Sequence, residues 1–378
     1  MLTKQQKEHV QNFRAFVQQE IVPVADQNDQ EEQTPRELIT KVAQQGYLGA
    51  LIPTSYGGQG WDMVTCGLLY EEVGRGCSSL RSLLTVHSMV ASALLRWGNQ
   101  QQKDCWLPAL ASGEVIGAFA LTEPHAGSNI AGIQTRAEPK GEAYVLNGTK
   151  KWITYGRIAN LFLVFAQTEQ GPGAFLLEQS APGLSIKALS NVLGTRASML
   201  AELHFNECRT SSKASCLVGK CGFGLTAVAA LCLDIGRYSV AWGCVGIIQA
   251  CLDASLAYAK TRQQFGSYLK EHQLIQQMLT EMITNAKAAR LLCYQAGVLK
   301  EAGDPNSMQE TWIAKYFAST HAFKAASDAV QIHGANGCSS AYPVQRYLRD
   351  AKVMEIIEGS TQIQQMKIAE YRYFTESI

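Results

Sequence analysis

The chain has 378 residues, of which 47% are hydrophobic and 17% are charged. It is too apolar to be disordered, and it is long enough for two or three compact domains. Since 33 Lys and Arg stand against 32 Asp and Glu, the net charge of +1 gives no summed field that favours nucleic acid or an acidic membrane surface.

The first third of the chain is predicted to be helical. Apolar residues recur at helical spacing over residues 4–20, and Pro23 is expected to end that helix. Three further apolar stretches, separated by turn residues, indicate more helices at 38–51, 63–74 and 80–97. We therefore expect an N-terminal helical domain over residues 1–114.

Residues 115–221 are predicted to form a middle β domain, because short apolar runs alternate there with Gly and Thr. Asn147-Gly148 stands between two β-favouring runs and predicts a hairpin turn. Further strands are expected at 161–166, 174–177 and 203–205.

Residues 222–378 return to the helical period and predict a helical bundle. One face is expected to carry Ile275, Met278, Leu279, Met282 and Ala286. The glycines at 222 and 224 match part of a dinucleotide fingerprint, but no clear strand precedes them and no acidic residue follows about 20 positions on. We interpret them as the start of a helix. The order helical, β, helical also disfavours a doubly wound fold.

The sequence predicts a reduced, cytoplasmic protein. Its 11 cysteines form no CxxC pair and are expected to be free thiols. The apolar runs are interrupted before the ~18 residues that cross a bilayer, and no leader composition precedes them.

Three segments are dense in small and hydrogen-bonding residues: 121–128 (LTEPHAGS), 151–156 (KWITYG) and 355–362 (EIIEGSTQ). In order and spacing they resemble the acyl-CoA dehydrogenase flavoproteins over nearly the whole chain. The resemblance implies an α+β fold with an N-terminal helical domain, a middle β-barrel-like domain and a C-terminal four-helix bundle. It also implies FAD as the cofactor.

The resemblance implies that the first two segments hold the flavin. Backbone N–H groups of a small-residue loop can polarise the flavin ring, and an indole can shield one face of it from water. Taken alone, the second segment would instead suggest a hairpin with a buried tryptophan. The residues implied to bind FAD here are Phe119, Leu121, Thr122, Ser128, Trp152 and Thr154.

The same resemblance extends into the last third of the chain. Arginine offers a planar fork to a pyrophosphate, and glycine lets backbone approach it, although Arg262 alone would be read as a surface charge. In the family these groups reach FAD partly across a subunit boundary, which implies a homodimer or homotetramer. The further residues implied to bind FAD are Arg262, Phe265, Gln273, Gln331, Gly334, Ser360 and Gln362.

Glu358 is predicted to be the catalytic base, because the resemblance places it beside the α-carbon of an acyl thioester. An α-proton is weakly acidic, so a positioned carboxylate with a raised pKa has to remove it while hydride passes to the flavin. Without the resemblance, Glu358 would be read as a glutamate near a helix N-terminus. One branch of the family carries its base at the position of Gly236, which has no side chain to do this.

Four residues are expected to bind the substrate: Gly236, Arg237, Val240 and Ile357. Two alternatives remain open. Arg237 could form a helix ion pair with Asp234, and the small residues at 236, 240 and 243 could serve close helix packing.

The sequence around 236–246 and 349–359 is most similar to family members that oxidise short polar acyl groups tethered to an acyl carrier protein. Trp242 and Ile357 are consistent with a reshaped acyl pocket, and His125 and Asn129 depart from the usual loop near the expected thioester arm. Two alternatives are kept. One is a short-chain acyl-CoA dehydrogenase of catabolism that passes electrons to a soluble flavoprotein, and the other is a catalytically silent scaffold that binds a carrier protein.

Overall fold

The computed structural model describes residues 2–375, with the side chains of 372–375 left aside. Six helices precede the first strand: α1 (Lys4–Phe16), α2 (Val22–Glu31), α3 (Arg36–Gln44), α4 (Met63–Gly76), α5 (Ser78–Trp97) and α6 (Gln100–Ser112). The strands of the middle region follow, with one short helix: β1 (Gly117–Ala120), β2 (Arg136–Lys140), β3 (Ala143–Ile153), β4 (Leu161–Ala166), β5 (Gly173–Glu178), β6 (Leu184–Ala188), β7 (Ala201–Ser212), α7 (Lys213–Cys216) and β8 (Leu217–Val218). The last part is helical except for a small hairpin: α8 (Ala230–Thr261), β9 (Gln263–Gln264), β10 (Ser267–Tyr268), α9 (Gln273–Glu301), α10 (Ser307–His333), α11 (Val344–Met354) and α12 (Thr361–Thr375).

The middle region contains two four-stranded sheets with the orders β1-β4-β5-β8 and β2-β3-β7-β6. Strand β4 is buried along its whole length because its two faces contact different cores. Leu163 and Phe165 belong to a cluster with α5 and α6, whereas Phe162 and Val164 belong to a cluster shared with the second sheet. The alternation of side chains along one strand thus joins the helical and β layers.

The hairpin predicted at Asn147-Gly148 is wrong. Strand β3 runs straight through these residues and pairs with β2 and β7, with an irregularity in register at Gly148. Asn147 Nδ2 donates to Glu207 Oε1 at 2.8 Å, and a Cβ on Gly148 would lie 2.6 Å from Thr135 Oγ1. The asparagine makes a cross-strand bond and the glycine allows a close approach, so neither residue turns the chain.

Pro23 does not end the first helical segment. A π-helical turn at Val17–Ile21 links α1 to α2, and Pro23 lies in the first turn of α2. At that position the missing N–H of proline is least costly. The residues at 222 and 224 do lead into a helix, because a π-helical turn at Gly224–Ala229 continues directly into α8.

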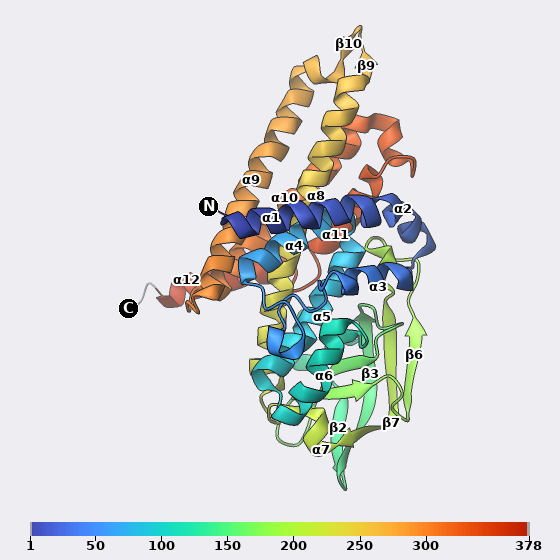
Figure 1. Cartoon of the computed structure of the whole chain (residues 1–378), viewed down its shortest axis with the longest axis vertical. Helices are drawn as coiled ribbons and strands as arrows, with labels where there is room; N and C mark the ends of the chain where they lie inside the picture. The colour runs from blue at the N-terminus through green and yellow to red at the C-terminus, as the bar shows by residue number, and fades with distance from the viewer. Residues whose placement is uncertain (1, 376–378) are drawn as a thin grey trace.

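Helix α8 is the central element of the C-terminal bundle and lies beside α9, α10 and α11 and against α4 and α5 (Figure 1). Its 32 residues give a length of about 48 Å at 1.5 Å per residue. The segment Gly224–Thr261 is long and apolar enough to cross a membrane, but 72% of its most apolar window is buried inside the protein. It is therefore typical of a core helix. All eleven cysteines are free, and most are buried, as predicted.

Candidate active site

Glu358 lies in the short connection between α11 and α12, and its backbone is left-handed. Its φ is 55°, and that of the following Gly359 is 89°. A non-glycine residue in this conformation costs roughly 1–2 kcal/mol, so the turn needs support. Three helices supply side chains that donate to its carbonyl groups. Gln364 donates to both carbonyls, Arg237 to that of Glu358 at 3.1 Å, and Lys315 to that of Gly359 at 2.8 Å.

The carboxylate of Glu358 lies directly over the backbone of α8 at Gly236. A Cβ atom on Gly236 would stand 2.3 Å from Glu358 Oε2, so a larger residue would displace the carboxylate. Oε2 is buried and has no hydrogen-bond partner among the described residues. The structure therefore holds a carboxylate oxygen that is free to accept a proton.

Burial raises the pKa of Glu358 to about 7, because an ionised carboxylate loses its solvation there. The cations of Arg237, Arg81 and Lys315 oppose this effect without cancelling it. A carboxyl group with this pKa is partly protonated and partly ionised near neutral pH. It is therefore suited to take up a proton and later release it.

The helix ion pair considered for Arg237 and Asp234 does not form. Asp234 is paired instead with Lys300 of α9, and Arg237 Nε donates to the carbonyl of Glu358. Arg237 thereby positions the Glu358 turn.

The segments at 121–128 and 151–156 lie side by side in the middle domain. Lys151 N donates to Thr122 O at 2.8 Å, which joins the two segments. Trp152 has φ 63° and is 52% exposed, so its indole stands on the surface and the alternative of a buried tryptophan is wrong. Leu121 is buried; Phe119, Thr122 and Thr154 are partly buried; and Ser128 is exposed.

A buried ion pair holds the first of these segments against β3. Lys150 Nζ lies 2.7 Å from Glu123 Oε1 and also donates to Leu121 O at 2.9 Å. The same carboxylate accepts from the backbone N–H groups of Gln134 and Thr135. Because both charges are buried and hydrogen-bonded, this pair fixes the loop where the sequence predicted the flavin.

A second group of predicted cofactor residues lies at the far end of the bundle, around the β9–β10 hairpin (Figure 1). By the rise of the helix, Arg262 stands about 39 Å along α8 from Gly236. Phe265 is 97% exposed, with φ 52°. One chain therefore does not bring this group to Glu358. Its members are all exposed: Arg262, Phe265, Gln273, Gln331 and Gly334.

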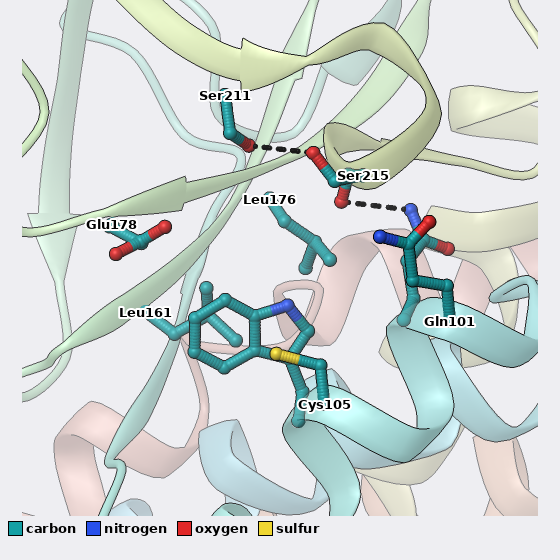
Figure 2. Close-up of a pocket in the computed structure, with 9 residues that line it drawn as sticks. Gln101, Cys105, Leu161, Leu176, Glu178, Ser211 and Ser215 are labelled. Carbon is teal, nitrogen blue, oxygen red and sulfur yellow. Dashed lines mark hydrogen bonds between the residues drawn. The ribbon is translucent and has the colours of Figure 1, made fainter.

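The remaining predicted residues surround Glu358 or lie behind it. Ser360 and Gln362 line a hollow at the surface of the α11–α12 connection. Ile357 is partly buried against the main core, and Val240 is fully buried in α8. A second hollow, between α6 and the β4–β5 sheet, is lined by residues such as Cys105 and includes none of the predicted site residues (Figure 2).

Sequence reasoning did not single out three residues around Glu358, namely Arg81, Lys315 and Gln364. Each is almost completely buried, and each lies on a different helix. Arg81 carried a signal in the sequence, because no other Asp, Glu, Lys or Arg stands between residues 78 and 95. A lone charge in an apolar helix indicates a buried group with a specific task.

The sequence matches three family models along its length. These are the N-terminal, middle and C-terminal domains of acyl-CoA dehydrogenase, at residues 3–114, 118–208 and 222–371. An acyl-CoA dehydrogenase of Bacillus subtilis (strain 168) is 40% identical over 364 residues, which is 95% of each chain. The chain belongs to the acyl-CoA dehydrogenase family.

Solved structures agree with this assignment over the whole fold. Butyryl-CoA dehydrogenase from Megasphaera elsdenii has a TM-score of 0.95 at 33% identity and covers 99% of each chain. A glutaryl-coenzyme A dehydrogenase in complex with glutaryl-CoA has a TM-score of 0.94 at 36% identity, covering 98% of this chain and 95% of that one. The prolyl acyl carrier protein oxidase AnaB has a TM-score of 0.93 at 31% identity, covering 98% and 99%.

Members of this family are FAD-dependent oxidoreductases that act on acyl thioesters, and this chain is such an enzyme. A related glutaryl-CoA dehydrogenase from Mycobacterium smegmatis has been solved with FADH2, with 30% identity and a TM-score of 0.93, covering 98% of this chain and 95% of that one. The described residues fit this cofactor. The exposed indole of Trp152 offers a flat face, and the hollow lined by Ser360 and Gln362 offers polar groups.

Proposed function

We propose that Glu358 removes the α-proton of a bound acyl thioester. The observation that carries this proposal is the buried, unpartnered Oε2 of Glu358 above Gly236. When bound, FAD accepts the hydride that leaves the β-carbon, which completes a two-electron oxidation to the α,β-unsaturated thioester. The turn around Glu358 fixes the base, since Gln364 and Lys315 hold its carbonyl groups.

The middle domain would hold the flavin ring at the two joined segments. Trp152 would cover one face of the ring, and Thr122 and Thr154 would offer hydroxyl groups at its edge. Phe119 and Leu121 would supply apolar contacts, and the exposed hydroxyl of Ser128 would reach a phosphate. Ser360 and Gln362 would contact the remaining polar part of the cofactor.

The residues at the far end of the bundle would complete the cofactor site of a second subunit. Arg262 and Phe265 are too distant from Glu358 to serve the site of their own chain. The outer face of α9 supports assembly, because Leu274 is 72% exposed and Leu291 is 61% exposed. We therefore expect a homodimer or a homotetramer. We also expect the enzyme to act in the cytoplasm.

For the substrate, we favour a short polar acyl group tethered to an acyl carrier protein. The similarity to a prolyl acyl carrier protein oxidase supports this, as do the exposed His125 and Asn129 on the loop where the thioester arm would lie. The similarity to butyryl-CoA dehydrogenase supports the alternative of a short-chain acyl-CoA dehydrogenase with a soluble flavoprotein as electron acceptor. The Oε2 atom of Glu358 has no hydrogen-bond partner among the described residues, which argues against the alternative of a catalytically silent scaffold.

Anaerobic bleaching of the flavin tests these proposals. The same acyl groups would be presented on CoA and on an acyl carrier protein, at one protein concentration. Faster bleaching by the carrier-bound form supports the carrier protein, and faster bleaching by the CoA form refutes it. If no thioester bleaches the flavin of an FAD-loaded protein, the proposed dehydrogenase activity is wrong.

A further inference from the structure

Lys315 of α10 is a buried cation whose hydrogen-bond acceptors are neutral. The residue is completely buried, and its Nζ donates to Gly359 O at 2.8 Å and to Glu355 O at 3.4 Å. The lysines of β3 and α9 with nearly buried side chains, Lys150 and Lys300, each pair with a carboxylate. Lys315 forms no such pair with a described residue. Because a buried ammonium group without a counter-charge is costly, the position of Lys315 calls for a reason.

The two carbonyl groups that Lys315 contacts stand at the two ends of the turn that carries Glu358. Glu355 is the C-terminal cap of α11, and Gly359 stands two residues before α12. A cation is favourable at a helix C-terminus, because the last carbonyl groups carry partial negative charge. Gln364 of α12 donates to the carbonyl groups of Glu358 and Gly359. Lys315 is therefore the side chain that joins the beginning of the turn to its end.

Glu358 is the carboxylate that matches this cation. The side chain of Glu355 already pairs with Lys352 at 2.8 Å. Glu358 forms no such pair among the described residues, and its buried Oε2 has no hydrogen-bond partner there. The charge of Lys315 attracts the ionised carboxylate of Glu358. A cation and a carboxylate that both lack an ion-pair partner thus face the same buried site.

Four titratable or charged groups face Lys315. Arg237 and Cys244 come from α8, and Glu355 and Glu358 come from the α11–α12 connection. Burial raises the pKa of the Cys244 thiol to about 12, so this group is neutral near pH 7. Burial also lowers the pKa of Lys315 to about 8, and its amine is therefore mostly charged at pH 7. Of the four groups, Glu358 is the one that the proposed reaction protonates.

We propose that Lys315 is a positioning residue for proton removal, because it ties together the two ends of the turn and presents a positive charge to the carboxylate of Glu358. The bonds to the carbonyl groups hold Oε2 over Gly236, and the charge favours the ionised form that accepts the proton. Lys315 acts only through Glu358 and touches neither substrate nor flavin. This inference rests on the proposed function of Glu358 as the base.

Melting temperatures test the charge without any substrate. The full-length protein as purified is compared with Glu358→Gln, and Lys315→Met is compared with Lys315→Met/Glu358→Gln, from pH 5 to pH 9. In each pair the difference grows as pH rises, because the raised pKa of Glu358 costs stability until the carboxylate is fully ionised. Without the cation, this difference should level off at least about 0.5 pH unit higher. If both pairs level off at the same pH, the proposal is overturned.

The pH profile of anaerobic flavin bleaching is the second test, with butyryl-CoA and a butyryl carrier protein as probes. Lys315→Met and Lys315→Gln should both move the rising limb upward by at least about 0.5 pH unit, since glutamine keeps a donor but lacks the charge. Lys315→Arg keeps both and should restore the profile. A slower rate with an unmoved limb in all three variants would show that Lys315 only supports the fold.

Lys324→Gln is the matched control, because Lys324 lies on the same helix, is half exposed and pairs with Glu281 and Asp328. It should leave the profile unchanged. If Lys315→Met does not fold, the comparison of Lys315→Gln with Lys315→Arg makes the same distinction. If the butyryl thioesters do not bleach the unaltered enzyme, the melting temperatures still decide. Failure of this inference alone leaves the dehydrogenase function intact, because the unaltered enzyme then still bleaches.

Discussion

Replacing Glu358 by glutamine should stabilise the protein at alkaline pH while it abolishes flavin bleaching. The pKa of Glu358 lies at about 7 in the folded chain, against an ordinary value of 4.5. The folded state therefore binds a proton more tightly than the unfolded state, and stability falls as pH rises from about 4.5 to 7. Over this interval the free energy of unfolding falls by about 1.36 kcal/mol per pH unit, so the total loss is about 3 kcal/mol by pH 8.

The assay is the melting temperature of Glu358→Gln and of the unaltered protein, measured by circular dichroism from pH 5 to pH 9 at one protein concentration. The two should melt together near pH 5, and the variant should melt several degrees higher at pH 8. Glu138→Gln on the exposed strand β2 is the control, because it removes a carboxylate that water already solvates. A constant offset at every pH, or a variant that is less stable at pH 8, would refute the claim that burial raises this pKa.

Further changes test other parts of the site. Gly236→Ala places a methyl group 2.3 Å from Glu358 Oε2, so the rate of flavin bleaching should fall at least about 100-fold while the 450 nm absorbance of bound FAD persists. Lys150→Met removes the buried cation that is paired with the carboxylate of Glu123, and it should lower the free energy of unfolding by about 3–5 kcal/mol, measured by urea unfolding; a loss below about 1 kcal/mol would contradict the importance of the buried pair. Phe265→Ser should weaken FAD retention on gel filtration without lowering the solubility of the chain, because the ring is 97% exposed in one subunit; full retention would refute its place in a neighbouring site. The bleaching rate should rise with pH through about 7 as Glu358 ionises, and a flat profile would argue against Glu358 as the base.

Local patterns predicted many of the elements correctly. Periodic apolar residues predicted helices that the structure contains as α4 and α5, and the apolar runs at 161–166 and 174–177 are β4 and most of β5. The order of three motifs predicted the family, because each keeps its spacing within a helical, β, helical arrangement. These features depend on residues that are close in the chain, which is why sequence alone sufficed.

The predictions that failed depended on partners distant in sequence. Asn147-Gly148 has the composition of a turn, but its side-chain partner is Glu207 and its close neighbour is Thr135. Propensity for a turn was overridden by pairing with two strands. At Trp152 only the alternative of a buried tryptophan failed, because the side chain is 52% exposed and its backbone is left-handed.

The sequence by itself determined the family and the cofactor, because these follow from motifs of contiguous residues, and it predicted Glu358 as the base. The sequence also shows a glycine at position 236, but it does not reveal the structural reason for that glycine. Only the tertiary structure decided that Gly236 and Gly243 make room for a carboxylate and a guanidinium on one face of α8. Arg81 reaches that face from a helix more than 150 residues earlier in the chain, and its buried Nε has no hydrogen-bond partner among the described residues. Burial, which raises the pKa of Glu358, is a property of the assembled core and not of any segment.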